Sequence, residues 1–132
     1  MSNTRFVATL FDGRGNPNKV TVAFTMALNA RMKGHDTTLI LMAEAVELGQ
    51  PGAIDLDIGA PFEPVDALLG RYRELGGKIA ICSACMQHNG FTAQDMVPDY
   101  AIITAPQVID LLMEPAARCR SPEARSADRW AP

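Results

Sequence analysis

Residues 78–90 read KIAICSACMQHNG, and this stretch takes a short apolar strand directly into a helix. The apolar run ends at Cys82, and Ser83, Ala84 and Cys85 begin the helical turn. A cysteine at such a junction lies near the free backbone N–H groups of the next three residues, at the positive end of the helix dipole. That setting favours the thiolate, which is the nucleophilic form of the side chain. We therefore predict that Cys82 carries out sulfur chemistry.

Strands and helices alternate on both sides of this junction. Apolar runs at 5–11, 37–42 and 100–104 are predicted strands. Because these runs are continuously apolar, both faces of the sheet are expected to be buried, as in a parallel sheet covered by helices. The predicted fold class is therefore α/β, a Rossmann-like or flavodoxin-like three-layer sandwich with a mainly parallel sheet of four to five strands.

Apolar residues at helical spacing predict the buried helix faces. The first face follows a cap at Asn16 and comprises Val20, Ala23, Phe24, Ala27 and Leu28. The second comprises Val65, Leu68, Leu69 and Tyr72. The third follows a Thr104–Gln107 capping box and comprises Ala105, Val108, Ile109 and Leu112. Residues 43–48 are expected to form a short helix, and 49–63 an irregular connection.

A flavodoxin-like strand order, 2-1-3-4, would create a binding crevice between the first and third strands. The first strand runs into the loop Asp12-Gly13-Arg14-Gly15-Asn16, and the third ends at Cys82. This order would bring the loop and the thiol into one crevice. Because the loop precedes a helix start, Gly13, Gly15 and Asn16 are candidate ligands for an anion such as a persulfide. The commoner role of such a loop is an ordinary turn.

Length and composition fit one domain of 132 residues, 48% of them apolar. We expect an α/β domain at 1–114 and a tail at 115–132, mobile or packed on a neighbouring subunit. The net charge of −3, with basic residues scattered, argues against a nucleic-acid partner. Neither a signal peptide nor an apolar run of the about 18–20 residues that span a membrane is visible. A cytoplasmic protein is expected.

The cysteine count is odd, with a close pair at Cys82 and Cys85 and a distant Cys119. In a reducing cytosol, such a pair favours metal binding, redox work or catalysis over a structural disulfide. Cys85 is interpreted as a resolving thiol, a second sulfur acceptor or a packing residue. Cys82 itself has the alternative of a small buried hydrophobe. Cys119, between two arginines, is either an exchanging thiol or an exposed residue without a role.

A metal site is the other use of this region, because Cys82, Cys85 and His88 recur every third residue. Zinc sites usually take four ligands in two close pairs, and the further candidates are distant. We therefore expect no metal. His88 is interpreted as a solvent-facing residue near a helix end, with steering of a persulfide anion as its alternative role.

The segment KIAICSACMQHNGF, with a Gly-Gly turn before it and a strand and capped helix after it, resembles the DsrE/DsrF/TusD-like family of sulfur-relay proteins. The resemblance covers about residues 5–114. It implies a Rossmann-like parallel sheet, assembly as a trimer, hexamer or mixed hexamer, and a persulfide on Cys82 with Cys85 as a second cysteine. Of these assemblies we expect a homo-oligomer, a trimer or hexamer. Active members often carry Arg-Arg-Gly or Ala-Arg-Gly where this chain has His88-Asn89-Gly90.

The expected function is an intracellular sulfur carrier or sulfurtransferase without a cofactor. Cys82 would accept sulfane sulfur from a donor protein and pass it to an acceptor protein, and Cys85 would assist. The N–H groups of Ser83 and Ala84 would bind the persulfide anion. Two alternatives stay open: a non-catalytic oligomeric DsrE-like binding module, and a Cys82/Cys85 thiol–disulfide switch.

Overall fold

The computed structural model describes residues 4–113, so the tail and Cys119 lie outside the described residues. No helix in this described range is long and apolar enough to cross a membrane. The elements in chain order are β1 (Arg5–Leu10), α1 (Pro17–Met32), β2 (Asp36–Leu41), the 3₁₀ helix η1 (Ala43–Gly49), α2 (Val65–Glu74), β3 (Lys78–Cys82), α3 (Ser83–His88), the 3₁₀ helix η2 (Ala93–Asp95), β4 (Ala101–Ile103) and α4 (Ala105–Met113).

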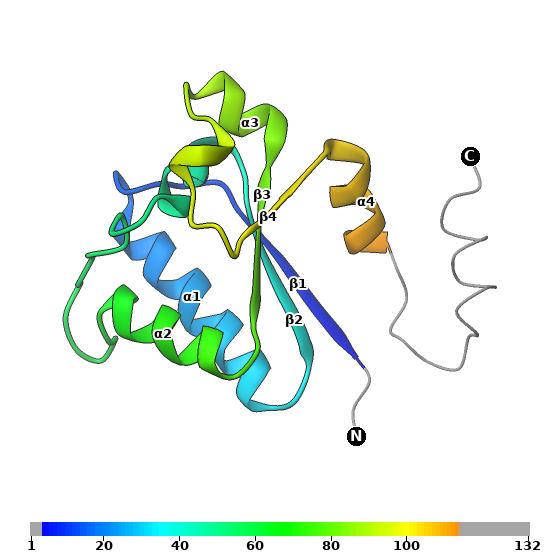
Figure 1. Ribbon diagram of the computed structural model, residues 1–132. Coiled ribbons are helices and arrows are strands. Elements are labelled where there is room, and N and C mark those ends of the chain that lie inside the picture. Colours follow the sequence, from blue (N-terminus) through cyan, green and yellow to red (C-terminus); the bar gives the residue numbers. More distant parts are fainter. Residues whose placement is uncertain (1–3, 114–132) are drawn as a thin grey trace.

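The four strands form one parallel sheet in the order β1-β2-β3-β4, which confirms the α/β fold (Figure 1). The flavodoxin-like order 2-1-3-4 is wrong, because β2 lies between β1 and β3. Strand order does not reverse anywhere among these strands. The predicted crevice between the first and third strands at a reversal point is therefore wrong as well.

Helices cover both faces of the sheet, as Figure 1 shows. α1 and α2 lie together on one face, and α4 lies on the other. Each new strand is added on the same side of the previous one, so right-handed crossovers bring α1 and α2 to the same face. The larger core lies between these two helices and the sheet and includes Phe24, Leu39 and Tyr72. Three layers result, as predicted.

The predicted buried faces are confirmed for α1 and α2, with Ala23 only partly buried. The prediction for α4 is wrong in part. Val108 is buried against the sheet, but Ile109 and Leu112 are 56% and 44% exposed. Leu111 packs against the sheet in their place. Because α4 is apolar on more than one side, its spacing alone does not select the side that meets the sheet.

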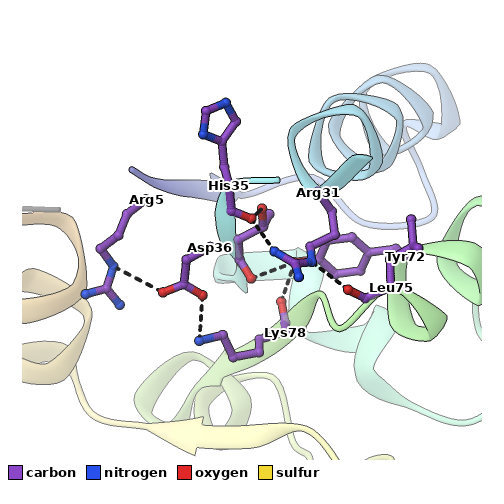
Figure 2. Close-up of polar contacts among 8 residues, drawn as sticks. Arg5, Arg31, His35, Asp36, Tyr72, Leu75 and Lys78 are labelled. Atoms are coloured by element: carbon purple, nitrogen blue, oxygen red, sulfur yellow. Dashed lines mark hydrogen bonds and ion pairs between the residues drawn. The ribbon is translucent and has the colours of Figure 1, made fainter. Parts of the chain in front are cut away.

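Polar contacts tie the amino ends of the strands together (Figure 2). Asp36 at the start of β2 lies 4.0 Å from Arg5 Nε of β1 and 3.0 Å from Lys78 Nζ of β3. Arg31, in the last turn of α1, donates to the carbonyl oxygens of His35 and Leu75, each at 2.6 Å. These contacts link three strands and two helices at the edge opposite the cysteines. The half-exposed ion pairs each contribute about 0–1 kcal/mol.

Tyr72 of α2 supplies a buried polar anchor in the same region. Its side chain is fully buried, and its hydroxyl donates to the carbonyl oxygen of Lys78 at 2.6 Å, with that of Thr37 at 3.3 Å. Burial raises the pKa of this hydroxyl, so it stays protonated as a donor. Its ring also occupies the space that a side chain at Gly77 would need. Tyr72 therefore fixes the distance between α2 and the start of β3.

Tyr72→Phe should lower the free energy of unfolding by about 1–3 kcal/mol, because the Lys78 carbonyl loses its hydroxyl donor in a buried place. Urea unfolding followed by circular dichroism measures the change. Tyr100→Phe is the matched control and should cause a smaller loss. The Tyr100 ring lies 5.2 Å from the partly exposed guanidinium of Arg73, which also pairs with Asp99, and a phenylalanine ring keeps this contact. Equal losses in the two variants would contradict this account of Tyr72.

Candidate functional site

Cys82 is the last residue of β3 and the residue that caps α3. Its side chain is 2% exposed, and within the described residues it makes no capping hydrogen bond to the helix. The sequence led us to expect a thiol presented to solvent beside the helix N–H groups. The strand–helix junction is present, but the Cys82 side chain is enclosed. Direct attack by Cys82 on a large substrate is therefore obstructed.

Cys85, one helical turn later, is the more accessible member of the pair. The residue is half-buried and lies close to Cys82. Burial raises the pKa of the Cys85 thiol, a hydrogen bond with the Ala43 backbone lowers it, and the Cys82 thiol raises it again; the net shift is upward. Cys85 is consequently protonated at neutral pH for most of the time. Both cysteines are free thiols.

Ala43 and Asn89 lie beside Cys85, and neither was predicted as a site residue. Ala43 follows β2 and has φ +50°, in the left-handed region. The Asn89 side-chain nitrogen donates to the Cys85 carbonyl at 2.8 Å and to the Ala43 carbonyl at 3.4 Å. Asn89 thus joins the end of α3 to the beginning of η1. An exposed asparagine at a helix end gives no signal of this contact in the sequence.

A cavity of about 580 Å³ lies beside this junction, at the carboxyl edge of the sheet. Its lining comes from the loop after β1, from η1 and from the turn after α3: Asp12, Gly13, Gly15, Asn16, Glu44, Glu47, Asn89 and Phe91. The cavity therefore unites the predicted glycine loop with four residues that were not predicted. The two glutamates, one turn apart in η1, resemble ordinary surface residues in the sequence.

The protein itself supplies a hydrogen-bond acceptor for the backbone of the glycine loop. The Glu47 carboxylate accepts a hydrogen bond from Arg14 N–H at 2.6 Å, and it occupies the space that a side chain at position 13 would need. The Arg14 guanidinium points elsewhere, to Asp55 at 2.5 Å, and holds the pKa of that carboxyl below its usual value. With Asp12 and Glu44 also on the cavity surface, negative charge disfavours an anion here.

The predicted site residues thus separate into two groups. Gly13, Gly15 and Asn16 line the cavity; Cys82, Cys85, Ser83, Ala84 and His88 are not among its lining residues. Ser83 is half-buried, Ala84 is exposed, and His88 is exposed in the last turn of α3. Persulfide binding by any of them stays a prediction. Among residues 4–113, no three His, Cys, Asp or Glu side chains gather as a metal-binding group.

Comparisons with known proteins bear on the identity of this fold. The crystal structure of the ychN protein from E. coli superposes with a TM-score of 0.68, covering 85% of this chain and 94% of that one at 15% identity. At this identity the likeness shows the fold alone. No curated protein sequence matches the chain. The DsrE/DsrF-like family matches residues 7–117, most of the sequence. The chain belongs to the DsrE/DsrF-like family.

Proposed function

We propose that this protein is an intracellular sulfur carrier that holds sulfane sulfur as a persulfide on Cys82 and passes it to a partner thiol. Proteins of the DsrE-like family generally act in sulfur relay. The observation that carries the proposal is the proximity of two free cysteines, one buried and one half-exposed, where β3 enters α3. An enclosed thiol suits storage, and its half-exposed neighbour suits exchange.

The exposures of the two thiols suggest an order for the transfer. The Cys85 thiolate attacks the terminal sulfur of a donor persulfide, and the donor leaves as its thiolate. Cys82 then attacks the same sulfur and releases the Cys85 thiolate, so each step replaces one S–S bond by another. The product, Cys82–S–SH, is enclosed and protected from thiols in solution. Passage to an acceptor thiol reverses the order.

A thiol–disulfide switch is the second candidate function, because Cys82 and Cys85 are both free thiols and lie close together. In this reaction the Cys85 thiolate attacks the inner sulfur of Cys82–S–SH. The Cys82–Cys85 disulfide forms and hydrosulfide leaves, so no external oxidant is required. The switch and the carrier therefore both pass through Cys82–S–SH. They differ in which sulfur of this persulfide is attacked next.

Incubation of the full chain with polysulfide should add the mass of one sulfur atom, as measured by intact-mass spectrometry. Cys82→Ser should abolish stable loading, because Cys85 alone holds the added sulfur in a half-exposed position. Cys85→Ser should slow loading about tenfold or more, because the donor must then reach an enclosed thiol. Loading should also rise with pH beyond neutrality, because the Cys85 thiolate forms only as pH approaches its raised pKa.

Cys119→Ser is the matched control, and it should load as the wild type does. Stable loading that survives in Cys82→Ser but is lost in Cys85→Ser would overturn the assignment of storage to Cys82. A product that lacks two hydrogen atoms and requires both cysteines would favour the switch. No mass change after incubation with either thiosulfate or polysulfide would favour the non-catalytic binding module.

We also propose that the protein assembles as a homo-oligomer, a trimer or hexamer, whose subunits meet through α4 and exchange sulfur with donor and acceptor proteins. The outer side of α4 carries Ile109, Leu112 and Met113 at helical spacing, with exposed fractions of 56%, 44% and 74%. An exposed apolar helix side of this kind is typical of an interaction site.

The double variant Ile109→Lys/Leu112→Lys should weaken assembly about 30-fold or more, because two apolar side chains at the centre of the contact become charged. Sedimentation equilibrium measures the association. Val22→Lys/Met26→Lys is the matched control, since these exposed apolar residues lie on α1. Dissociation by the α1 variant alone, or a monomeric wild-type chain, would contradict the proposed interface.

A further inference from the structure

Cys82 points to the side of the sheet that α4 covers. Its backbone is still extended, and side chains alternate between the two faces of a strand, so Cys82 shares a face with Ala80 and not with Ile81. Ala80 is buried with Val108 of α4 in a second, smaller core. Ile81 belongs to the larger core, which lies beneath α1 and α2. The enclosed thiol therefore faces the layer of α4.

The two neighbours of Cys82 in the sheet support this orientation. Ile103 of β4 is paired with Cys82, and residues paired in a sheet point to the same face. On the other side Leu41 pairs with Ile81, so Met42 lies at the level of Cys82. Both Ile103 and Met42 pack against the smaller core. Cys82 thus lies in a row between two side chains that belong to the core of α4.

The first turn of α4 lies over this row. The helix begins two residues after Ile103, and Figure 1 shows it running back along the sheet from the carboxyl edge. One turn later, Val108 is buried against Ile40 and Ala80, which pair with each other. That pair lies two residues closer to the amino ends of the strands than the row of Cys82. The start of α4 therefore covers the side of the thiol that faces away from the larger core.

Few side chains hold α4 on the sheet. Val108 is the one buried residue of this helix, and Leu111 packs beside it while partly buried. The other large apolar side chains of α4, Ile109, Leu112 and Met113, are exposed. A segment with few buried apolar contacts opens locally at a smaller free-energy cost than unfolding of the whole domain. α4 can therefore leave the sheet while the larger core stays folded.

We propose that α4 is a lid over Cys82, and that its displacement from the sheet gives a partner thiol a direct route to the stored sulfur. The proposal rests on the proposed function, because it concerns access to the thiol on which sulfur is stored. The route through Cys85 does not require this movement, since Cys85 packs against the larger core. Access to the two thiols is thus controlled by different elements, although they lie close together.

The test is the initial rate of Cys82 alkylation by iodoacetamide in the full chain, followed by site-resolved mass spectrometry. Val108→Ala removes two buried methyl groups that hold the lid closed, so Cys82 should react about 5–30 times faster, in proportion to the population of the open lid. The rate at Cys85 in the same sample should stay within about twofold of wild type. Leu111→Ala should also accelerate Cys82, and less strongly, because Leu111 is only partly buried.

Val20→Ala is the matched control, because it makes the same change at a fully buried position of α1 in the larger core. This variant destabilises the whole domain but keeps the contacts of α4, so its Cys82 rate should stay within about twofold of wild type. Urea unfolding should show that Val20→Ala loses at least as much global stability as Val108→Ala. Sedimentation equilibrium should show that both variants assemble as the wild type does, so that the rates compare equal assemblies.

The proposal is overturned if Val108→Ala leaves the Cys82 rate unchanged. Equal acceleration by Val108→Ala and Val20→Ala would also overturn it, because Cys82 would then react only in the unfolded chain. Acceleration at both cysteines in Val108→Ala would place the opening in α3 and would likewise refute the lid. Alkylation requires no sulfur donor, so a chain with the expected rates but no sulfur adduct would refute the proposed function and leave the lid intact.

Discussion

The register between β2 and β3 is the constraint on which the candidate site depends. Leu41 pairs with Ile81, so the residues that follow the two strands emerge side by side at the carboxyl edge. Both strands are buried on both faces over most of their length, and a slip by one residue would turn each apolar side chain to the wrong face. The hydrogen bond from the Asn89 side chain, just after α3, to the Ala43 carbonyl, just after β2, follows from this pairing.

The strands, the helices and their mainly parallel arrangement were predictable from sequence, because each element buries a continuous or periodic set of apolar residues. Tyr72 and Leu68 illustrate this for α2, where the spacing selects a single buried side. The strand order was not predictable, because alternation of strands and helices is compatible with several orders of a parallel sheet. The exposed side of α4 was missed for a related reason: Ile109 and Val108 are both apolar, and only the position of the sheet distinguishes them.

The candidate site was predictable only as far as side-chain chemistry reveals it. The pair of thiols was visible as a spacing of three residues at a strand end. Burial of Cys82 was not, because enclosure depends on the elements that surround the junction. The contributions of Ala43 and Asn89 depend on backbone conformation, for which alanine and asparagine are unremarkable residue types. The acidic lining of the cavity was missed because Glu44 and Glu47 follow β2, and the expected crevice was placed between other strands.

The Glu47 carboxylate beside the glycine loop also restricts which amino-acid substitutions the chain can accept there. Glu47 occupies the volume that any larger residue at position 13 would require, and the same carboxylate oxygen is the acceptor for Arg14 N–H. A larger residue at position 13 would expel the carboxylate, and a shorter residue at position 47 would leave the loop amide to water. The two positions are therefore linked, and homologues that lose the glycine are expected to have changed the acidic residue as well.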